Sequence, residues 1–123
     1  MPTQRILCID DNADTCELLT TMLGRSGLEA VSAPGVDEAL RLMEGERFSL
    51  YVVDFEMPGA SVLTPCEQLR AADACTPIVI FSGRAAEGDI EAGMLAGANA
   101  YVVKPELTEL VSTVKRLLLE VVS

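Results

Sequence analysis

The hydrophobic and polar positions of the chain follow two alternating patterns. Short continuous apolar runs are typical of strands covered on both faces of a sheet. Between them, apolar residues recur every three or four positions, which is the spacing of one face of a helix. The runs predict strands at residues 5–10, 28–33, 48–54, 77–82 and 100–104, and the intervening segments predict helices at residues 13–25, 35–47, 65–72, 85–98 and 107–121.

The last segment carries the clearest helical pattern. One apolar stripe is formed by Leu107, Leu110, Val111, Val114, Leu117, Leu118 and Val121. The third helix is expected to begin late, because Thr64 can cap it, Pro65 suits its first position and Glu67 completes a capping box. Five strands alternating with five helices predict an α/β domain with a parallel sheet and helices on both faces.

Four of the five predicted strands end in a polar or charged residue. Asp10 and Asp11 follow the first strand, Asp54 the third, Ser82 the fourth and Lys104 the fifth. The carboxyl ends of parallel strands share one edge of a sheet, and open α/β sheets bind ligands there, so we expect these side chains to converge. The second strand has no such residue, as expected for a strand at the side of the sheet.

The converging residues have the chemistry of a phosphoryl site. Crowded carboxylates repel one another and need a cation, and a set of oxygen ligands suits Mg²⁺, with Mn²⁺ as the alternative. The ammonium of Lys104 and the hydroxyl of Ser82 can neutralise and hydrogen-bond phosphoryl oxygens. Asp54, between the acidic pair and the lysine, can attack phosphorus and become an acyl phosphate.

The composition of the chain argues against several classes of function. A formal net charge of −10 over 123 residues disfavours direct binding to nucleic acid or an anionic membrane, and favours divalent cations and basic partner surfaces. The chain has no histidine, which excludes a histidine base, a catalytic triad and a phosphohistidine within it. Its 4 cysteines lack a C-x-x-C pair and are expected to be reduced. Without a membrane span or signal-peptide pattern, a cytoplasmic location is expected.

Four motifs carry a resemblance to a known family: CIDDN at 8–12, VVDFEMPG at 52–59, PIVIFSG at 77–83 and AGANAYVVKP at 96–105. Through them the chain resembles the response regulator receiver domain of two-component signalling, in order and over essentially its whole length. The resemblance implies a single receiver domain over residues 1–123. It also implies a flavodoxin-like, doubly wound (βα)5 sandwich of three layers, with a parallel sheet in the strand order 2-1-3-4-5.

The resemblance implies roles for the residues at the strand ends. Asp54 matches the phosphoacceptor, and Lys104 matches the lysine that contacts the phosphoryl group. Asp10 and Asp11 match the acidic pair that holds Mg²⁺, together with Asp54 and the backbone carbonyl of Glu56.

The family's conformational switch has matching positions as well. Ser82 matches the hydroxyl that moves toward the phosphoryl group, and Tyr101 matches the aromatic residue that turns inward with it. Pro105 matches the proline whose preceding peptide, Lys104–Pro105, is cis in the family.

Two residues are expected at the rim of the site. Glu56 and Arg84 stand two positions beyond Asp54 and Ser82, where family members influence the attack of water on the phosphoryl group. We expect an exposed ion pair that partly covers Asp54 and changes the lifetime of the acyl phosphate. The alternative is two solvated side chains, because exposed ion pairs contribute at most ~1 kcal/mol.

The chain departs from the family pattern directly after its MPG motif. Residues 60–65 replace the usual hydrophobic residue, Asp and Gly, and bring a proline to the start of the third helix. We expect an irregular loop there, and its effect on function stays open.

The expected partners are proteins. A histidine kinase or a phosphotransfer protein would supply the phosphoryl group. The output would be a protein target or a homodimer, bound through the face made by the fourth helix, fifth strand and fifth helix. In the fourth helix, Ile90, Met94 and Ala98 are expected to face inward and Leu95 outward, where it is either part of this patch or an isolated surface leucine.

Three function classes remain open on the sequence. The first is a phosphoacceptor switch, which is not an enzyme beyond assisting its own phosphorylation and dephosphorylation. The second is a pseudo-receiver that binds partners without phosphorylation, and the third is an Mg²⁺-dependent phosphohydrolase. The chain shows no output domain, so it is expected to be either a stand-alone regulator or a part of a larger protein.

Overall fold

A computed structural model of the chain describes residues 4–57 and 62–122, with side chains up to residue 120. Strands and helices alternate through this part of the chain, as predicted. They are β1 (Arg5–Ile9), α1 (Ala13–Arg25), β2 (Glu29–Ala33), α2 (Val36–Gly45), β3 (Leu50–Val53), α3 (Pro65–Ala72), β4 (Ile78–Ser82), α4 (Glu87–Leu95), β5 (Ala100–Val103) and α5 (Leu107–Val122).

The strands form one parallel sheet in the order β2-β1-β3-β4-β5, which confirms the predicted order. β2 lies at one side of the sheet, as its lack of a polar terminal residue indicated. Ile9 pairs with Val53, and Ser82 pairs with Val103. The residues that follow these pairs therefore emerge at the same edge of the sheet.

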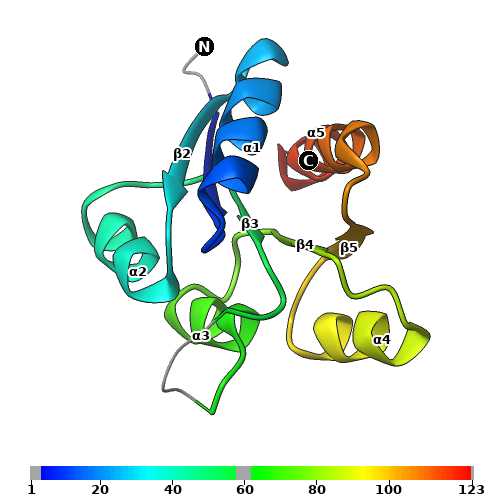
Figure 1. Ribbon diagram of the computed structural model, residues 1–123. Helices are drawn as coiled ribbons and strands as arrows, with labels where there is room; N and C mark the ends of the chain where they lie inside the picture. Colours follow the sequence, from blue (N-terminus) through cyan, green and yellow to red (C-terminus); the bar gives the residue numbers. More distant parts are fainter. Residues whose placement is uncertain (1–3, 58–61, 123) are drawn as a thin grey trace.

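Helices cover both faces of the sheet (Figure 1). α1 and α5 pack on one face, and α2, α3 and α4 lie on the other. Successive strand residues point to opposite faces, so Ile6 and Cys8 join the core under α1 and α5, whereas Leu7 and Ile9 join the core under α2 and α3. This two-sided burial explains the continuous apolar runs of the central strands.

The apolar stripe of α5 faces the sheet as predicted. Leu110, Val114, Leu117 and Leu118 are buried. Leu107 and Val111 are partly buried against the same core. Val121 was also predicted to belong to this stripe, but its side chain lies outside the described part of the structure.

α3 begins at Pro65, which confirms the late start predicted from the sequence. The Thr64 hydroxyl accepts a hydrogen bond from the Glu67 amide at 3.2 Å, and the Glu67 carboxylate accepts one from the Thr64 amide at 2.9 Å. Of the altered segment before α3, positions 60 and 61 lie outside the described residues. Val62 is fully exposed.

α4 differs from its prediction in length and in the face it buries. It spans Glu87–Leu95 rather than residues 85–98, and Met94 is 41% exposed instead of facing inward. Gly93 is buried in its place, because a residue without a side chain lets α4 approach the sheet closely. The outward position of Leu95, 81% exposed, is confirmed. Ile90 is partly exposed and Ala98 is buried.

Arg70 of α3 binds the segment that follows α4, a contact that the sequence did not indicate. Its guanidinium donates hydrogen bonds to the carbonyls of Gly97, Asp73 and Thr76 and to the side chain of Asn99, at 2.7–3.2 Å. Gly97 has φ +114, a left-handed conformation that favours glycine, and a Cβ there would lie 3.1 Å from the Arg70 side chain.

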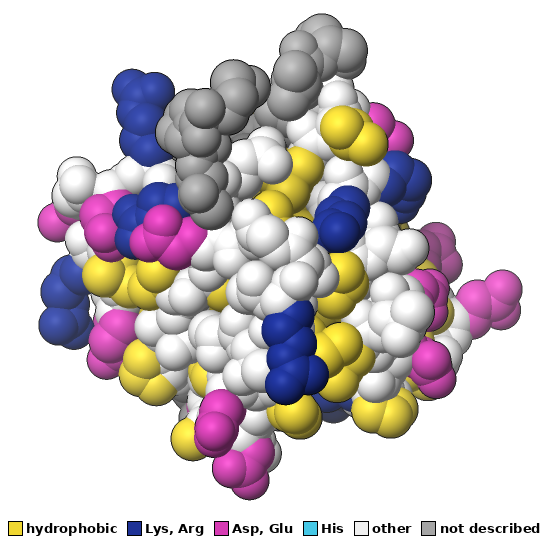
Figure 2. Space-filling view, turned by 90° about the horizontal axis from the view of Figure 1, so that it is seen from above, with side chains coloured by type: hydrophobic (Ala, Val, Ile, Leu, Met, Phe, Trp, Pro, Cys, Tyr) yellow, Lys and Arg dark blue, Asp and Glu magenta, His cyan; other side chains and the backbone are white. Residues whose placement is uncertain are grey.

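Charged side chains of both signs are interspersed with apolar ones on the face shown in Figure 2. The net charge of −10 is therefore not gathered into one acidic surface on this face. No helix within residues 4–57 and 62–122 is long and apolar enough to cross a bilayer.

Candidate functional site

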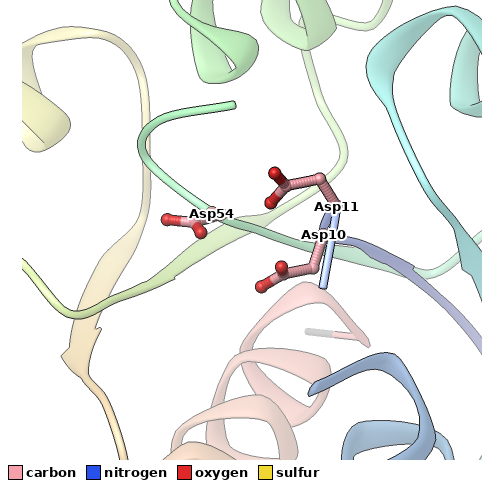
Figure 3. A group of neighbouring side chains, drawn as sticks. All are labelled: Asp10, Asp11 and Asp54. Carbon is pink, nitrogen blue, oxygen red and sulfur yellow. The ribbon is translucent and has the colours of Figure 1, made fainter. Parts of the chain in front are cut away.

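Three carboxylates meet at the carboxyl ends of β1 and β3 (Figure 3). Asp10 and Asp11 follow β1, Asp54 follows β3, and one oxygen of each lies within 4.8 Å of the others. Asp10 is only 2% exposed, whereas Asp11 lies at the surface. The buried carboxylate is anchored locally, since Asp10 Oδ1 accepts a hydrogen bond from the Asn12 amide at 2.9 Å. The predicted convergence of the three aspartates is thus present.

Lys104 reaches this cluster from the end of β5. Its Nζ lies 2.9 Å from Oδ2 of Asp10 and 3.2 Å from Oδ2 of Asp54. Burial of the lysine lowers its pKa, but hydrogen bonds and charge attraction from the two carboxylates outweigh burial and raise the pKa above its ordinary value. The lysine therefore stays protonated at neutral pH. The peptide bond that follows, Lys104–Pro105, is cis as the resemblance implied.

Ser82 is buried at the end of β4, beside β5, the strand that leads to Lys104. Its carbonyl accepts a hydrogen bond from the Lys104 amide at 2.8 Å, and its hydroxyl accepts one from the Arg84 amide at 3.2 Å. The hydroxyl is thereby linked to the segment that leads into α4. All five residues predicted at the strand ends lie at the same edge of the sheet.

The donor set of the cluster fits Mg²⁺. Carboxylate oxygens are the ligands that this hard cation prefers, and three of them converge within 4.8 Å. One ammonium, which contacts Asp10 and Asp54, offsets a single charge of the three carboxylates, so negative charge remains for a divalent cation to neutralise. Mn²⁺ would suit the same oxygen ligands.

The rim of the site carries the predicted ion pair. A guanidinium nitrogen of Arg84 lies 2.6 Å from Oε1 of Glu56, and both side chains are about half exposed, at 49% and 62%. A second nitrogen lies 3.3 Å from Asp89 in the first turn of α4. Arg84 therefore links the segment after Asp54 to the start of α4. Apart from its acidic character, nothing in the sequence indicated that Asp89 would contact Arg84.

Tyr101 lies on β5, with its ring among residues of three other segments. Its hydroxyl donates a hydrogen bond to the backbone carbonyl of Arg84 at 2.8 Å. Its ring meets that of Phe55 edge to face, with centroids 6.0 Å apart and planes at 72°. Partial burial is the main reason that the pKa of the Tyr101 hydroxyl is raised. Phe55, directly after Asp54, was not recognised as a contact of the tyrosine from the sequence.

Two residues of the first loop and helix also contact the site and were missed. Asn12 caps α1 through its side chain, which accepts a hydrogen bond from the Thr15 amide at 3.0 Å. The Cys16 thiol lies 3.2 Å from the backbone carbonyl of Asp10 and donates to it. An Asn directly before a helical pattern is a recognisable cap signal, whereas a cysteine inside that pattern points to no particular partner.

Comparison with known families identifies the class of this protein. The profile of the response regulator receiver domain matches residues 6–115. The chain therefore belongs to this family and is a receiver domain of two-component signalling.

The similar sequences are those of response regulators. The transcriptional regulatory protein PrrA of Mycobacterium tuberculosis is 42% identical over 118 residues, which cover 93% of this chain and 49% of the relative. The DNA-binding response regulator MtrA of the same organism is 34% identical over 113 residues, or 91% of this chain and 49% of the relative. The chain thus spans about half the length of these relatives.

The similar structures are receiver domains with the same fold. The response regulator TrrA of Thermotoga maritima, solved in complex with Mg²⁺-BeF, has a TM-score of 0.80 and 32% identity and covers 94% of this chain and 99% of its own. The receiver domain of the Francisella response regulator 1452 has a TM-score of 0.87, 24% identity and coverage of 97% and 99%. At that identity the second likeness concerns the fold alone.

Proposed function

We propose that this domain is a phosphoacceptor switch whose phosphorylated residue is Asp54. The observation that carries the proposal is the position of Lys104, which bridges Asp10 and Asp54 at 2.9 and 3.2 Å while Asp11 completes the acidic cluster. A nucleophilic carboxylate, a fixed ammonium and a set of oxygen ligands for a cation are the parts that phosphoryl transfer needs. Retention of all these parts argues against a pseudo-receiver that works without phosphorylation.

The transfer would begin with a phosphohistidine on a histidine kinase or phosphotransfer protein. A carboxylate oxygen of Asp54 forms a bond to phosphorus while the bond between phosphorus and the partner's imidazole nitrogen breaks. The electron pair of the broken bond stays on that nitrogen. The Lys104 ammonium offsets the charge of the phosphoryl oxygens, which it can reach because it already contacts Asp54.

Mg²⁺ would be held by Asp10, Asp11, Asp54 and the backbone carbonyl of Glu56. When bound, it supplies positive charge that neutralises the phosphoryl oxygens and lowers the repulsion between the incoming group and the aspartates. Mn²⁺ is the alternative cation for these ligands.

The response to phosphorylation would run through Ser82 and Tyr101. The Ser82 hydroxyl, now an acceptor for the Arg84 amide, would turn and donate to a phosphoryl oxygen of phosphorylated Asp54. The segment from Ser82 to Arg84 moves with it, and Tyr101 follows because its hydroxyl is bonded to the Arg84 carbonyl. We also propose that the Glu56–Arg84 pair covers the acyl phosphate and slows its hydrolysis.

The proposed partners follow from the same assignment. A histidine kinase or phosphotransfer protein docks at the edge of the sheet where Asp10, Asp54 and Lys104 follow the strands. A protein target or a second copy of the domain binds the face made by α4, β5 and α5. We propose that this domain works in the cytoplasm and does not itself contact nucleic acid or a membrane, in keeping with its net charge of −10. PrrA and MtrA are named as a transcriptional regulatory protein and a DNA-binding response regulator, and these names describe proteins about twice as long as the matched segment.

Intact-mass measurement after incubation with acetyl phosphate and Mg²⁺ tests the proposal. We expect the mass to rise by one phosphoryl group in the wild type and to stay unchanged in Asp54→Ala or after chelation of Mg²⁺. An unmodified wild type would support the pseudo-receiver instead. Steady turnover of a phosphomonoester would support the phosphohydrolase.

A further inference from the structure

Gly93 lies in the interior of α4, at the point where this helix meets the sheet. A Cβ added there would come within 2.8 Å of Ile80 Cδ1 and 2.8 and 2.9 Å of Cδ2 and Cε2 of Tyr101. Side chains in proteins essentially never approach so closely, so any larger residue forces the Tyr101 ring or α4 to move. Glycine is poorly suited to a helix interior, and the close contact gives a reason for its presence here.

The Tyr101 ring is held from three directions. Gly93 borders it on the side of α4, and Phe55, the residue after Asp54, meets it edge to face. Its hydroxyl is bonded to the Arg84 carbonyl at 2.8 Å, while the Arg84 amide is bonded to the Ser82 hydroxyl at 3.2 Å. The position of the ring is therefore coupled to the segment that carries the hydroxyl of the site.

We propose that Gly93 is a positioning residue for Tyr101: by leaving room for the ring, it keeps the Ser82–Arg84 segment where the site needs it. This inference rests on the proposed function. It adds a residue outside the site that controls how the site responds to a phosphoryl group. A methyl group at position 93 displaces the ring, breaks the hydroxyl's bond to Arg84 and weakens the response to a phosphoryl group. The atoms nearest to an added Cβ belong to Ile80 and Tyr101, so the change acts on the site through the tyrosine ring and leaves Asp54 and Lys104 themselves in place.

The test compares Gly93→Ala with Gly88→Ala in the full chain. Both glycines lie in α4, but a Cβ at Gly88 meets nothing within 4 Å. Both variants replace a glycine of α4 with alanine, and they differ in the contact with Tyr101. Biosynthetic fluorotyrosine labels the 2 tyrosines of the chain for fluorine NMR, and Tyr51→Phe assigns their signals.

The first readout needs no ligand. We expect the fluorine signal of Tyr101 to move toward that of a solvent-exposed tyrosine in Gly93→Ala and to stay in place in Gly88→Ala. The second readout is the affinity for beryllofluoride, a phosphoryl analogue, in the presence of Mg²⁺. We expect Gly93→Ala to weaken this affinity about fivefold or more, the size of a typical coupling between sites.

A double-mutant cycle separates positioning from a general effect on folding. In a Tyr101→Ala background, Gly93→Ala should no longer change the beryllofluoride affinity, because the ring through which it acts is gone. If Gly93→Ala folds poorly by circular dichroism, Gly93→Ala/Ile80→Val removes the clash with Ile80 Cδ1 and keeps the one with Tyr101. The signal shift and weakened affinity are expected in that variant too.

The inference is overturned if Gly93→Ala, or its Ile80→Val form, matches Gly88→Ala in both readouts. It is also overturned if Gly93→Ala weakens binding equally with and without Tyr101. These outcomes are distinct from failure of the proposed function, in which the wild type itself binds no beryllofluoride in the presence of Mg²⁺. The Tyr101 signal without ligand then still decides whether Gly93 positions the ring.

Discussion

The ammonium of Lys104 lies 3.2 Å from a carboxylate oxygen of Asp54, and the pair joins the ends of β5 and β3 across the intervening strand β4. The same nitrogen lies 2.9 Å from Asp10, whose side chain is almost completely buried. One cation thus serves two carboxylates that would otherwise repel each other in a partly buried site. This arrangement makes Lys104 a competitor of any other cation at the cluster.

Replacing Lys104 with methionine should therefore strengthen Mg²⁺ binding. Removing a positive charge next to two of the three carboxylates is expected to raise the affinity about tenfold, as measured by calorimetric titration. Lys115→Met is the matched control, because it removes an equal charge from an exposed position on α5. Equal Mg²⁺ affinities for the two variants would show that Lys104 does not restrain the acidic cluster.

Breaking the Glu56–Arg84 ion pair should shorten the lifetime of the acyl phosphate. Arg84→Ala and Glu56→Ala each remove the 2.6 Å contact, and we expect hydrolysis to accelerate about two- to fivefold, within the energy range of an exposed pair. The rate is followed by loss of the phosphorylated mass after the phosphodonor is removed. The double variant should match the single ones if the two residues act together.

Arg116→Ala is the control for this experiment. It breaks an exposed ion pair with Glu120, at 3.3 Å on α5, and should leave the hydrolysis rate unchanged. If Arg84→Ala behaved like Arg116→Ala, the ion pair at the rim would have no part in protecting the acyl phosphate.

Asp73 should make the stability of the fold depend on pH in the acid range. Burial raises its pKa, but hydrogen bonds from Thr76, the Tyr51 hydroxyl and the Cys75 amide outweigh burial and hold the pKa well below its ordinary value. A depressed folded-state pKa adds stability above the unfolded value of about 4, and this stability is lost as pH falls through the folded-state pKa.

We therefore expect Asp73→Asn to lower the free energy of unfolding by about 1–2 kcal/mol at neutral pH, allowing for partial exposure to solvent. The difference from the wild type should narrow as pH falls below ~4. Denaturant unfolding at several pH values measures it, with Glu91→Gln on the surface of α4 as the control. A difference that stays constant down to the acid limit would refute the role given to the Asp73 carboxylate.

Leu95 is expected to contribute to an interface that forms on phosphorylation. It is 81% exposed on α4, beside the partly exposed Met94. Sedimentation analysis with Mg²⁺ and beryllofluoride should show self-association of the wild type, weakened at least about tenfold by Leu95→Glu, since a charge is costly in an apolar contact. Leu18→Glu on α1, at another exposed leucine, should have no such effect. Identical behaviour of Leu95→Glu and the wild type would make Leu95 an isolated surface leucine.

The strand-end cluster was predictable because a parallel sheet obeys a simple geometric rule. Once residues 5–10, 48–54, 77–82 and 100–104 were read as parallel strands, their terminal residues had to share one edge. The central strands run continuously apolar, so their type left little ambiguity, although β3 is shorter, at Leu50–Val53, than the predicted residues 48–54. The contact of Lys104 with Asp10 and Asp54 is a direct consequence of this topology.

The contacts of α4 were not predictable in the same way. A helical stripe is recognised by its apolar side chains, so the pattern placed Met94 inward and ignored Gly93, which has no side chain to count. The structure buries the glycine because Ile80 and Tyr101 occupy the space that a side chain would need. Arg70 likewise gave no signal, since its partners are mostly backbone carbonyls of segments distant in sequence.

The most direct test of the central claim is chemical mapping of the phosphorylated residue. An acyl phosphate on aspartate is reduced by borohydride to homoserine, which peptide mass spectrometry locates after incubation with acetyl phosphate and Mg²⁺. The account predicts homoserine at position 54, absent when Mg²⁺ is chelated. Homoserine at position 10 or 11 instead, or a phosphorylated protein without homoserine at position 54, would contradict it.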